Sequence, residues 1–155
     1  MSRAGYNGRT DAGFTLIEML VALAIIAIIM AIALPRLTRP SDGVRLAAAA
    51  REVTGALRLT RSASIAANAE HVWRLDVEKR RFSASAGSAE RSLPPDIRAE
   101  LKVAEPERIS ASRGGIRFFP DGSSTGGEIA LSLKGRSIKL CVHWLTGQPG
   151  EGAQC

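Results

Sequence analysis

The chain has 155 residues, enough for one ordinary domain besides any membrane segment. Its net charge of +6 makes anionic partners a possibility to weigh, and its two cysteines exclude a disulfide scaffold or a cysteine-rich zinc site. Aromatic residues are scarce, at 5%, so we expect a modest core that gains from a larger assembly.

An apolar run from Phe14 to Leu34 lies near the N-terminus and contains one charged residue, Glu18. As a helix its 21 residues would span roughly 31 Å, close to the hydrocarbon thickness of a bilayer. Three interpretations compete. A secretory signal peptide would use the arginines ahead of the run, Arg3 and Arg9, and the small residues at 31–33. A plain anchor would only span the membrane. The third interpretation gives Glu18 a function.

A carboxylate inside a span costs about 2.5 to 3.5 kcal/mol on insertion scales, so it marks function and needs a partner. Gly13-Phe14-Thr15-Leu16-Ile17-Glu18, followed by a long apolar helix, resembles the type IV prepilin signature. The resemblance implies that a dedicated prepilin peptidase cuts after Gly13, on the cytoplasmic side, and methylates the new N-terminal residue Phe14. The leader 1–13 is then lost, and residues 14–35 are kept as a transmembrane and assembly helix.

The same resemblance gives Glu18 a role, because it would be the fifth residue of the mature chain. In that family this carboxylate pairs with the N-terminal amine of a neighbouring subunit during filament assembly. A buried carboxylate is tolerable beside an ammonium, so the pair can set the register between subunits. Pro35, 22 residues into the mature chain, also matches the pattern.

Residues 36–70 are predicted to form the amphipathic second half of the N-terminal helix. Leu46, Val53 and Leu57 recur on one side at helical spacing, with alanines between them. The arginines at 51, 58 and 61 would occupy the outer face. Pro35 and the Pro40 to Gly43 segment are expected to kink or interrupt the helix.

From His71 onward the pattern changes to the alternation typical of strands. Strands are predicted at 71–77, 82–84, 98–103, 115–119, 128–133 and 137–144, with Trp73 and Trp144 in the core. Residues 147–155 are predicted to be a loose tail. The predicted fold is therefore α+β and pilin-like, with a long N-terminal helix packed on the antiparallel sheet of a head at 71–155.

The segment from Phe118 to Gly127 is glycine-rich, but no Gly-Lys-Ser/Thr follows, and a calcium loop starting at Asp121 would end on Ser132. It is therefore predicted to be a turn between strands. Together with His143-Trp144-Leu145-Thr146-Gly147, this segment resembles the carboxy-terminal part of the minor pseudopilin H family of type II secretion. The likeness covers residues 13 to about 70 and 115 to 147.

The resemblance implies a structural subunit of the periplasmic pseudopilus, which exports folded proteins across the outer membrane. Its partners would be the major pseudopilin, the minor pseudopilins of the tip, and the prepilin peptidase. It would be a single-pass protein of the inner membrane with its head in the periplasm. No cofactor or metal is expected.

The alternative is a minor pilin of a type IV pilus that binds DNA in natural transformation. Arginines at 108, 113, 117 and 136 keep this open, because phosphate contacts need clustered basic side chains. Against it, residues 148–155 contain no basic residue. Nucleic acid is therefore a less favoured partner. An enzyme is the least favoured class, because His71 and His143 stand without a nucleophile motif or a well-placed carboxylate pair.

Cys141 falls on the polar side of its predicted strand, so we expect it outside the deep core. In an oxidising periplasm Cys155 could fold back and bridge to it. Closing a loop of about 15 residues would stabilise the head by about 3 kcal/mol in the chain-entropy model. Two free thiols, or a bond to another chain, are the alternatives.

Overall fold

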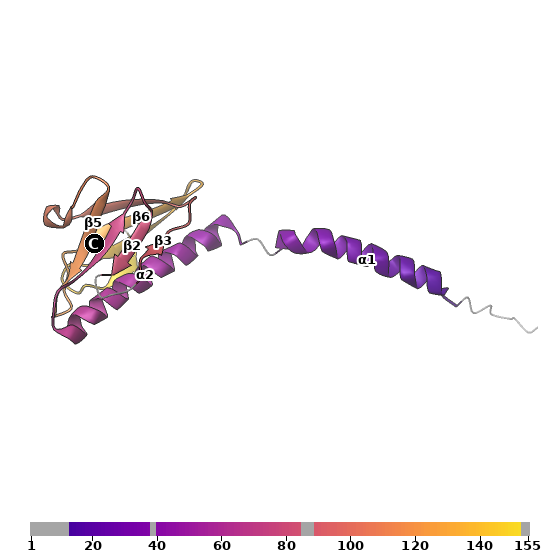
Figure 1. The fold of residues 1–155 in the computed structure, drawn as a ribbon, viewed down its shortest axis with the longest axis horizontal. Coiled ribbons are helices and arrows are strands. Elements are labelled where there is room, and N and C mark those ends of the chain that lie inside the picture. The colour runs from indigo at the N-terminus through magenta and orange to yellow at the C-terminus, as the bar shows by residue number, and fades with distance from the viewer. Residues whose placement is uncertain (1–12, 38–39, 85–88, 153–155) are drawn as a thin grey trace, which may run out of the picture. The chain divides into compact units, whose positions relative to one another are not determined.

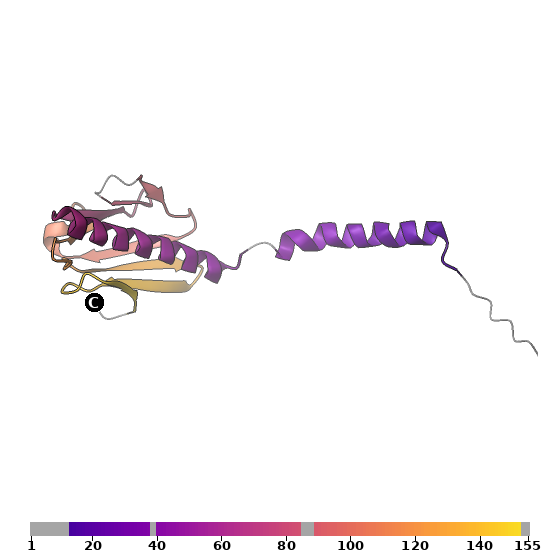
Figure 2. The ribbon, with the colours of Figure 1, turned by 90° about the horizontal axis from the view of Figure 1, so that it is seen from below.

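A computed structural model describes residues 13–37, 40–84 and 89–152 of the chain. The chain forms two compact units, residues 1–39 and residues 40–155. Within the first, α1 (Leu16–Leu37) holds the apolar run. Within the second, Figures 1 and 2 show a long helix, α2 (Asp42–Ala67), lying along the strands of a β-rich head.

Helix α2 has well-defined ends. At its start, the Ser41 hydroxyl accepts a hydrogen bond from the Val44 N–H at 3.4 Å. At its end, Asn68 takes the left-handed conformation with φ 47°. The Asn68 and Ala69 N–H groups donate to the last carbonyls of the helix, at 3.3 and 3.2 Å. The sequence therefore marks both boundaries of α2 with capping residues.

The head contains two four-stranded antiparallel sheets. The first has the order β3-β2-β1-β5, built from β1 (His71–Asp76), β2 (Arg81–Ala84), β3 (Arg91–Ser92) and β5 (Arg113–Phe118). The second has the order β4-β6-β7-β8, built from β4 (Arg98–Val103), β6 (Gly127–Leu133), β7 (Arg136–Val142) and β8 (Pro149–Glu151). A short 3-10 helix, η1 (Glu105–Glu107), lies between β4 and β5 in the chain.

The hairpin between β6 and β7 shows how local sequence sets the register. Leu133 pairs with Arg136, which leaves the two-residue loop Lys134-Gly135. Both loop residues have positive φ, 46° and 80°, as a type I′ turn requires. Ile129, Leu131 and Leu133 of β6 therefore all reach the buried face.

The core lies between α2 and both sheets. Helix α2 contacts β1, β2 and β5 of the first sheet and β6, β7 and β8 of the second. Trp73 of β1 is fully buried, with its ring centroid 6.0 Å from that of Phe82. The other large, fully buried apolar side chains come from α2, from strands of both sheets and from the residue just before β4: Leu46, Val53, Leu57, Leu75, Ile97, Ile116, Phe118, Ile129, Leu131 and Leu140. This core confirms the predicted fold class, a helix packed on an antiparallel β-rich head.

The interruption expected between Pro35 and Gly43 is present, since α1 runs past Pro35 to Leu37 and α2 begins separately at Asp42. Other sequence predictions differ from the structure. The prediction of a loose tail is wrong for Pro149–Glu151, because this segment pairs with β7 as an edge strand. Trp144 is 60% exposed and is not in the core, because β7 ends at Val142 and the alternating pattern stops there.

Candidate functional site

The residues of the prepilin-like signature lie at the start of α1. Gly13 and Phe14 precede the helix in an irregular conformation and are exposed, and a side chain at Gly13 would meet nothing within 4 Å. Thr15 caps the helix, since its hydroxyl and carbonyl oxygens accept hydrogen bonds from the Glu18 N–H at 3.3 and 3.1 Å. The Gly13–Phe14 bond is therefore accessible, and the helix starts immediately after it.

Glu18 stands in the first turn of α1, where a negative charge complements the helix dipole. Its side chain is exposed and makes no ion pair with any residue that the structure describes. Residues Leu16–Ala33 of the same helix are long and apolar enough to cross a membrane, by length and composition. A single carboxylate thus lies at one end of an otherwise apolar span.

The two segments of the second resemblance lie together in the head. The Ser124 N–H donates to the Trp144 carbonyl oxygen at 2.8 Å, and the Ser124 hydroxyl donates to the His143 carbonyl oxygen at 3.2 Å. Gly126 has φ 70°, and a Cβ there would lie 3.2 Å from the Cβ of Trp144. The predicted turn at 118–127 is therefore a loop that packs against the loop at 143–147.

Arg61 of α2 joins these two loops, a role that sequence reasoning missed. The prediction put Arg61 on the outer face of the helix, but it is half-buried. Its Nε–H donates to the carbonyl oxygens of Gly122 and Thr146, both at 3.0 Å. The acceptors are 61 and 85 residues away in sequence, so helical spacing carried no signal of the contact.

The arginines behind the DNA-binding alternative are mostly paired with carboxylates. Arg108 lies 3.1 Å from Glu105, and Arg113 lies 4.0 Å from Asp76. Arg117 is the most engaged, since its Nε is 2.7 Å from Glu107 Oε1 and its Nη1 is 2.8 Å from Glu70 Oε2.

Hydrogen bonds to the side chain of Glu107, and then to that of Glu70, raise the pKa of Arg117 above its ordinary value. Arg136, by contrast, makes no ion pair among the described residues. Because three of these four arginines already pair with carboxylates, less unpaired positive charge is available to bind DNA phosphates than the sequence suggests.

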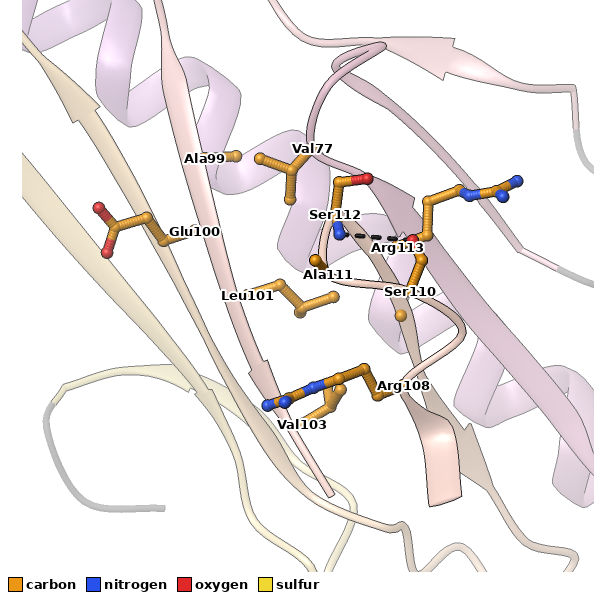
Figure 3. A pocket seen from close by; sticks show the side chains of 11 residues that line it. Val77, Ala99, Glu100, Leu101, Val103, Arg108, Ser110, Ala111, Ser112 and Arg113 are labelled. Atoms are coloured by element: carbon orange, nitrogen blue, oxygen red, sulfur yellow. Dashed lines mark hydrogen bonds between the residues drawn. The ribbon is translucent and has the colours of Figure 1, made fainter. Parts of the chain in front are cut away.

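A hollow of about 240 Å³ lies between β4 and the segment leading into β5 (Figure 3). Leu101 and Val103 of β4 approach Gly114, where an added Cβ would lie 3.1 and 3.0 Å from them. The polar lining consists of the hydroxyls of Ser110 and Ser112, the carboxylate of Glu100, and the guanidinium groups of Arg108 and Arg113.

The remaining candidate residues are not brought together into a reactive site. Among the described residues, no group of three or more His, Cys, Asp or Glu side chains could hold a metal ion. Cys141 is disulfide-bonded and only 4% exposed. It is nevertheless absent from the core cluster that its neighbours Leu140 and Val142 join, as expected for the opposite face of β7. Cys155 lies outside the described residues, and the pairing of the two stays a prediction.

Comparison with known families gives two matches. The family model of the prokaryotic N-terminal methylation motif matches residues 8–34, which include Gly13, Phe14 and Glu18. The model of the type II transport protein GspH matches residues 49–147, which include most of α2 and both loops held by Arg61. The chain belongs to the GspH family.

A curated relative supports the same family. The type II secretion system protein H of Xanthomonas campestris pv. campestris is 34% identical over 140 residues, which cover 90% of this chain and 82% of the relative. The GspH family is one of structural pseudopilins, and both resemblances stated from the sequence are confirmed at this level.

Solved structures share the fold of this GspH-family chain. The minor pseudopilin EpsH of Vibrio cholerae superposes with a TM-score of 0.56 at 14% identity, covering 70% of this chain and 97% of that one. The type IV minor pilin FimU of Pseudomonas aeruginosa gives 0.54 at 14% identity, covering 70% and 88%. Because secretion and pilus proteins both match, the fold by itself does not separate the two systems.

Proposed function

We propose that the chain is a minor pseudopilin of a type II secretion system, a structural subunit of the pseudopilus that exports folded proteins across the outer membrane. The observation that carries the proposal is the GspH-family match over 49–147, joined to an N-terminal methylation motif on the same chain. The 34% identical relative named for type II secretion supports this system over a pilus. Its partners are the other pseudopilins, with the major pseudopilin on one side and the tip subunits on the other.

The N-terminal segment suits a subunit that is processed and then kept in the membrane. We propose that prepilin peptidase cuts between Gly13 and Phe14 and that Phe14 is then N-methylated. The exposed, irregular backbone at this bond supports the proposal, because a peptidase must reach an unfolded peptide link. Helix α1 then anchors the chain in the inner membrane, with the head in the periplasm.

Glu18 is proposed to bind the N-terminal ammonium of the adjacent subunit. Without such a partner, its charge opposes the insertion of α1, at a cost of up to about 2.5 to 3.5 kcal/mol, the value for a charged side chain at the centre of a span. In the assembled filament an ammonium would compensate the carboxylate and fix the axial register of one helix against the next. The carboxylate would thus act in assembly and not in chemistry.

Two substitutions test this proposal on the full chain in its own bacterium. Replacing Gly13 with Leu should leave the leader attached, which the intact mass of the membrane-bound protein would reveal. Glu18→Val should give a cleaved, membrane-inserted protein that no longer enters pseudopili. Incorporation of Glu18→Val at the wild-type level would refute the role of this carboxylate, and Thr15→Ser is the matched control for a mild change in the same turn.

A further inference from the structure

Another hollow lies on the head. It has a volume of about 380 Å³ and is lined by three residues of α2 and two of the segment that enters β8: Arg58, Arg61, Ser62, Gln148 and Pro149. Every side chain of this lining except the proline carries a hydrogen-bond donor, and none is acidic. A hollow with this lining favours the binding of an anion.

The guanidinium of Arg61 is held in place before any ligand arrives. Its Nε–H is shared between the carbonyl oxygens of Gly122 and Thr146, at 3.0 Å each. Gly122 and Gly147 pack closely around it, since a Cβ on either would lie within 3.1 Å of an Arg61 atom. Both glycines have positive φ, 84° and 61°, so two loops bend around this one side chain. Such a fixed donor loses little entropy on binding.

The two arginines also carry uncompensated charge. Neither makes an ion pair with a carboxylate that the structure describes. The carbonyl partners of Arg61 are neutral, so its positive charge remains. Arg58 and Arg61 stand three residues apart on one helix, where like charges oppose each other. Binding of an anion between them would relieve this repulsion.

We propose that Arg58 and Arg61 bind a carboxylate on a neighbouring pseudopilin, so that an aspartate or glutamate of the partner enters this hollow. Guanidinium groups match carboxylates with paired hydrogen bonds, and the Ser62 hydroxyl and Gln148 amide add further donors. The inference rests on the proposed function, because it takes the neighbouring subunit from the pseudopilus. To that function it adds the surface of the head that contacts the neighbouring subunit and the type of side chain that the neighbour contributes.

Arg58 is the residue to change, because Arg61 also supports two loops. A photo-reactive amino acid at Ile65, an exposed position of α2 one turn after Arg61 that does not line the hollow, should capture another pseudopilin next to an acidic residue when the full chain is expressed in living cells. Arg58→Glu should lower this capture about tenfold, as expected for the loss of a close interfacial charge pair. Arg51→Glu is the matched control, because Arg51 is exposed on the same helix seven residues earlier and does not line the hollow. It should change capture less than about twofold.

A charge reversal completes the test. Changing the captured acidic residue of the partner to Lys should restore capture by Arg58→Glu. Equal capture by Arg58→Glu and Arg51→Glu would overturn the inference, as would a captured species that is no pseudopilin. Binding of millimolar inorganic phosphate to the detergent-solubilised chain, lost in Arg58→Glu while capture is unchanged, would replace the partner carboxylate with a free anion.

Measuring protein export distinguishes a failure of this inference from a failure of the proposed function. If deletion of the chain blocks export while Arg58→Glu captures normally, only the carboxylate site is wrong. If deletion leaves export intact, the proposed function is wrong, and the pseudopilin partner is wrong with it.

Discussion

The ion pair of Arg117 with Glu107 connects β5 to η1, and its loss should destabilise the head. Glu107 is only 8% exposed, and the side chain of Arg117 is 35% exposed. Arg117 Nε donates to Glu107 Oε1 at 2.7 Å, and Nη2 lies 3.5 Å from Oε2. Arg117→Met keeps the apolar stem but leaves a buried carboxylate without its cation.

The size of the expected loss in stability follows from how deeply the ion pair is buried. Breaking a fully buried pair costs about 3 to 5 kcal/mol, because the remaining charge is uncompensated. Solvent reaches about a third of Arg117, so we expect a loss of about 2 kcal/mol in the free energy of unfolding. Glu70→Gln is the matched control, since Glu70 contacts the same guanidinium but is 52% exposed. Its loss should cost less than about 1 kcal/mol.

Urea unfolding of residues 40–155, followed by the emission of the buried Trp73, measures these losses. A loss of 2 kcal/mol lowers the urea midpoint by roughly 1 M for a head of this size. The double variant Arg117→Met, Glu107→Gln should recover about 1 kcal/mol relative to the sum of the two single losses. The reasoning is refuted if Arg117→Met costs no more than Glu70→Gln, or if the two single losses add.

Three further predictions concern the same head. Gly147→Ala should lower the free energy of unfolding by about 2 kcal/mol, because φ at Gly147 is 61° and an added Cβ would clash with the Gly122 carbonyl oxygen. Gly150→Ala is the control, because a Cβ there meets nothing within 4 Å, and it should leave stability unchanged in the same urea assay. The hydroxyl of Ser123, and then its backbone N–H, donate hydrogen bonds to Asp121 and lower the pKa of this carboxylate below its ordinary value of 3.8. The ionised carboxylate therefore stabilises the head above pH 3.8, and this stabilisation is lost as the pH falls through the lower pKa of the folded state. Ser123→Ala should raise the Asp121 pKa in an NMR titration, and an unchanged pKa would contradict this cause. If Cys141 pairs with Cys155, the denatured chain without reductant should contain no thiol that reacts, and reductant should lower its stability by about 3 kcal/mol.

The parts of the fold that follow from local pattern were predictable from sequence. The apolar run gives α1, the spacing of Leu46, Val53 and Leu57 gives the buried side of α2, and alternation gives the longer strands. Ser41 lies within the segment that was expected to break the helix, and it caps α2. These signals lie within a few residues of the structure they specify.

The features that sequence reasoning missed depend on distant contacts or on weak local signals. β3 has two residues, Arg91 and Ser92, both exposed, so no alternation exists to reveal it. β8 contains Pro149 and Gly150, which usually indicate a loop, and it is a strand because β7 offers a free edge.

The candidate site divides in the same way. Gly13, Phe14 and Glu18 lie within six consecutive residues that carry a motif, so the sequence alone was enough to propose them. Arg61 resembles any exposed helical arginine until two loops from the far end of the chain close around it. Glu107 was missed for the same reason, since its partner Arg117 is known only once η1 packs beside β5.

Export of folded enzymes tests the central claim most directly. In a strain that lacks this chain, secreted enzymes should accumulate in the periplasm, and the wild-type chain supplied in trans should return them to the medium. If export is unaffected by the deletion while DNA uptake or pilus formation is lost, the chain serves a type IV pilus and its assignment to type II secretion is wrong.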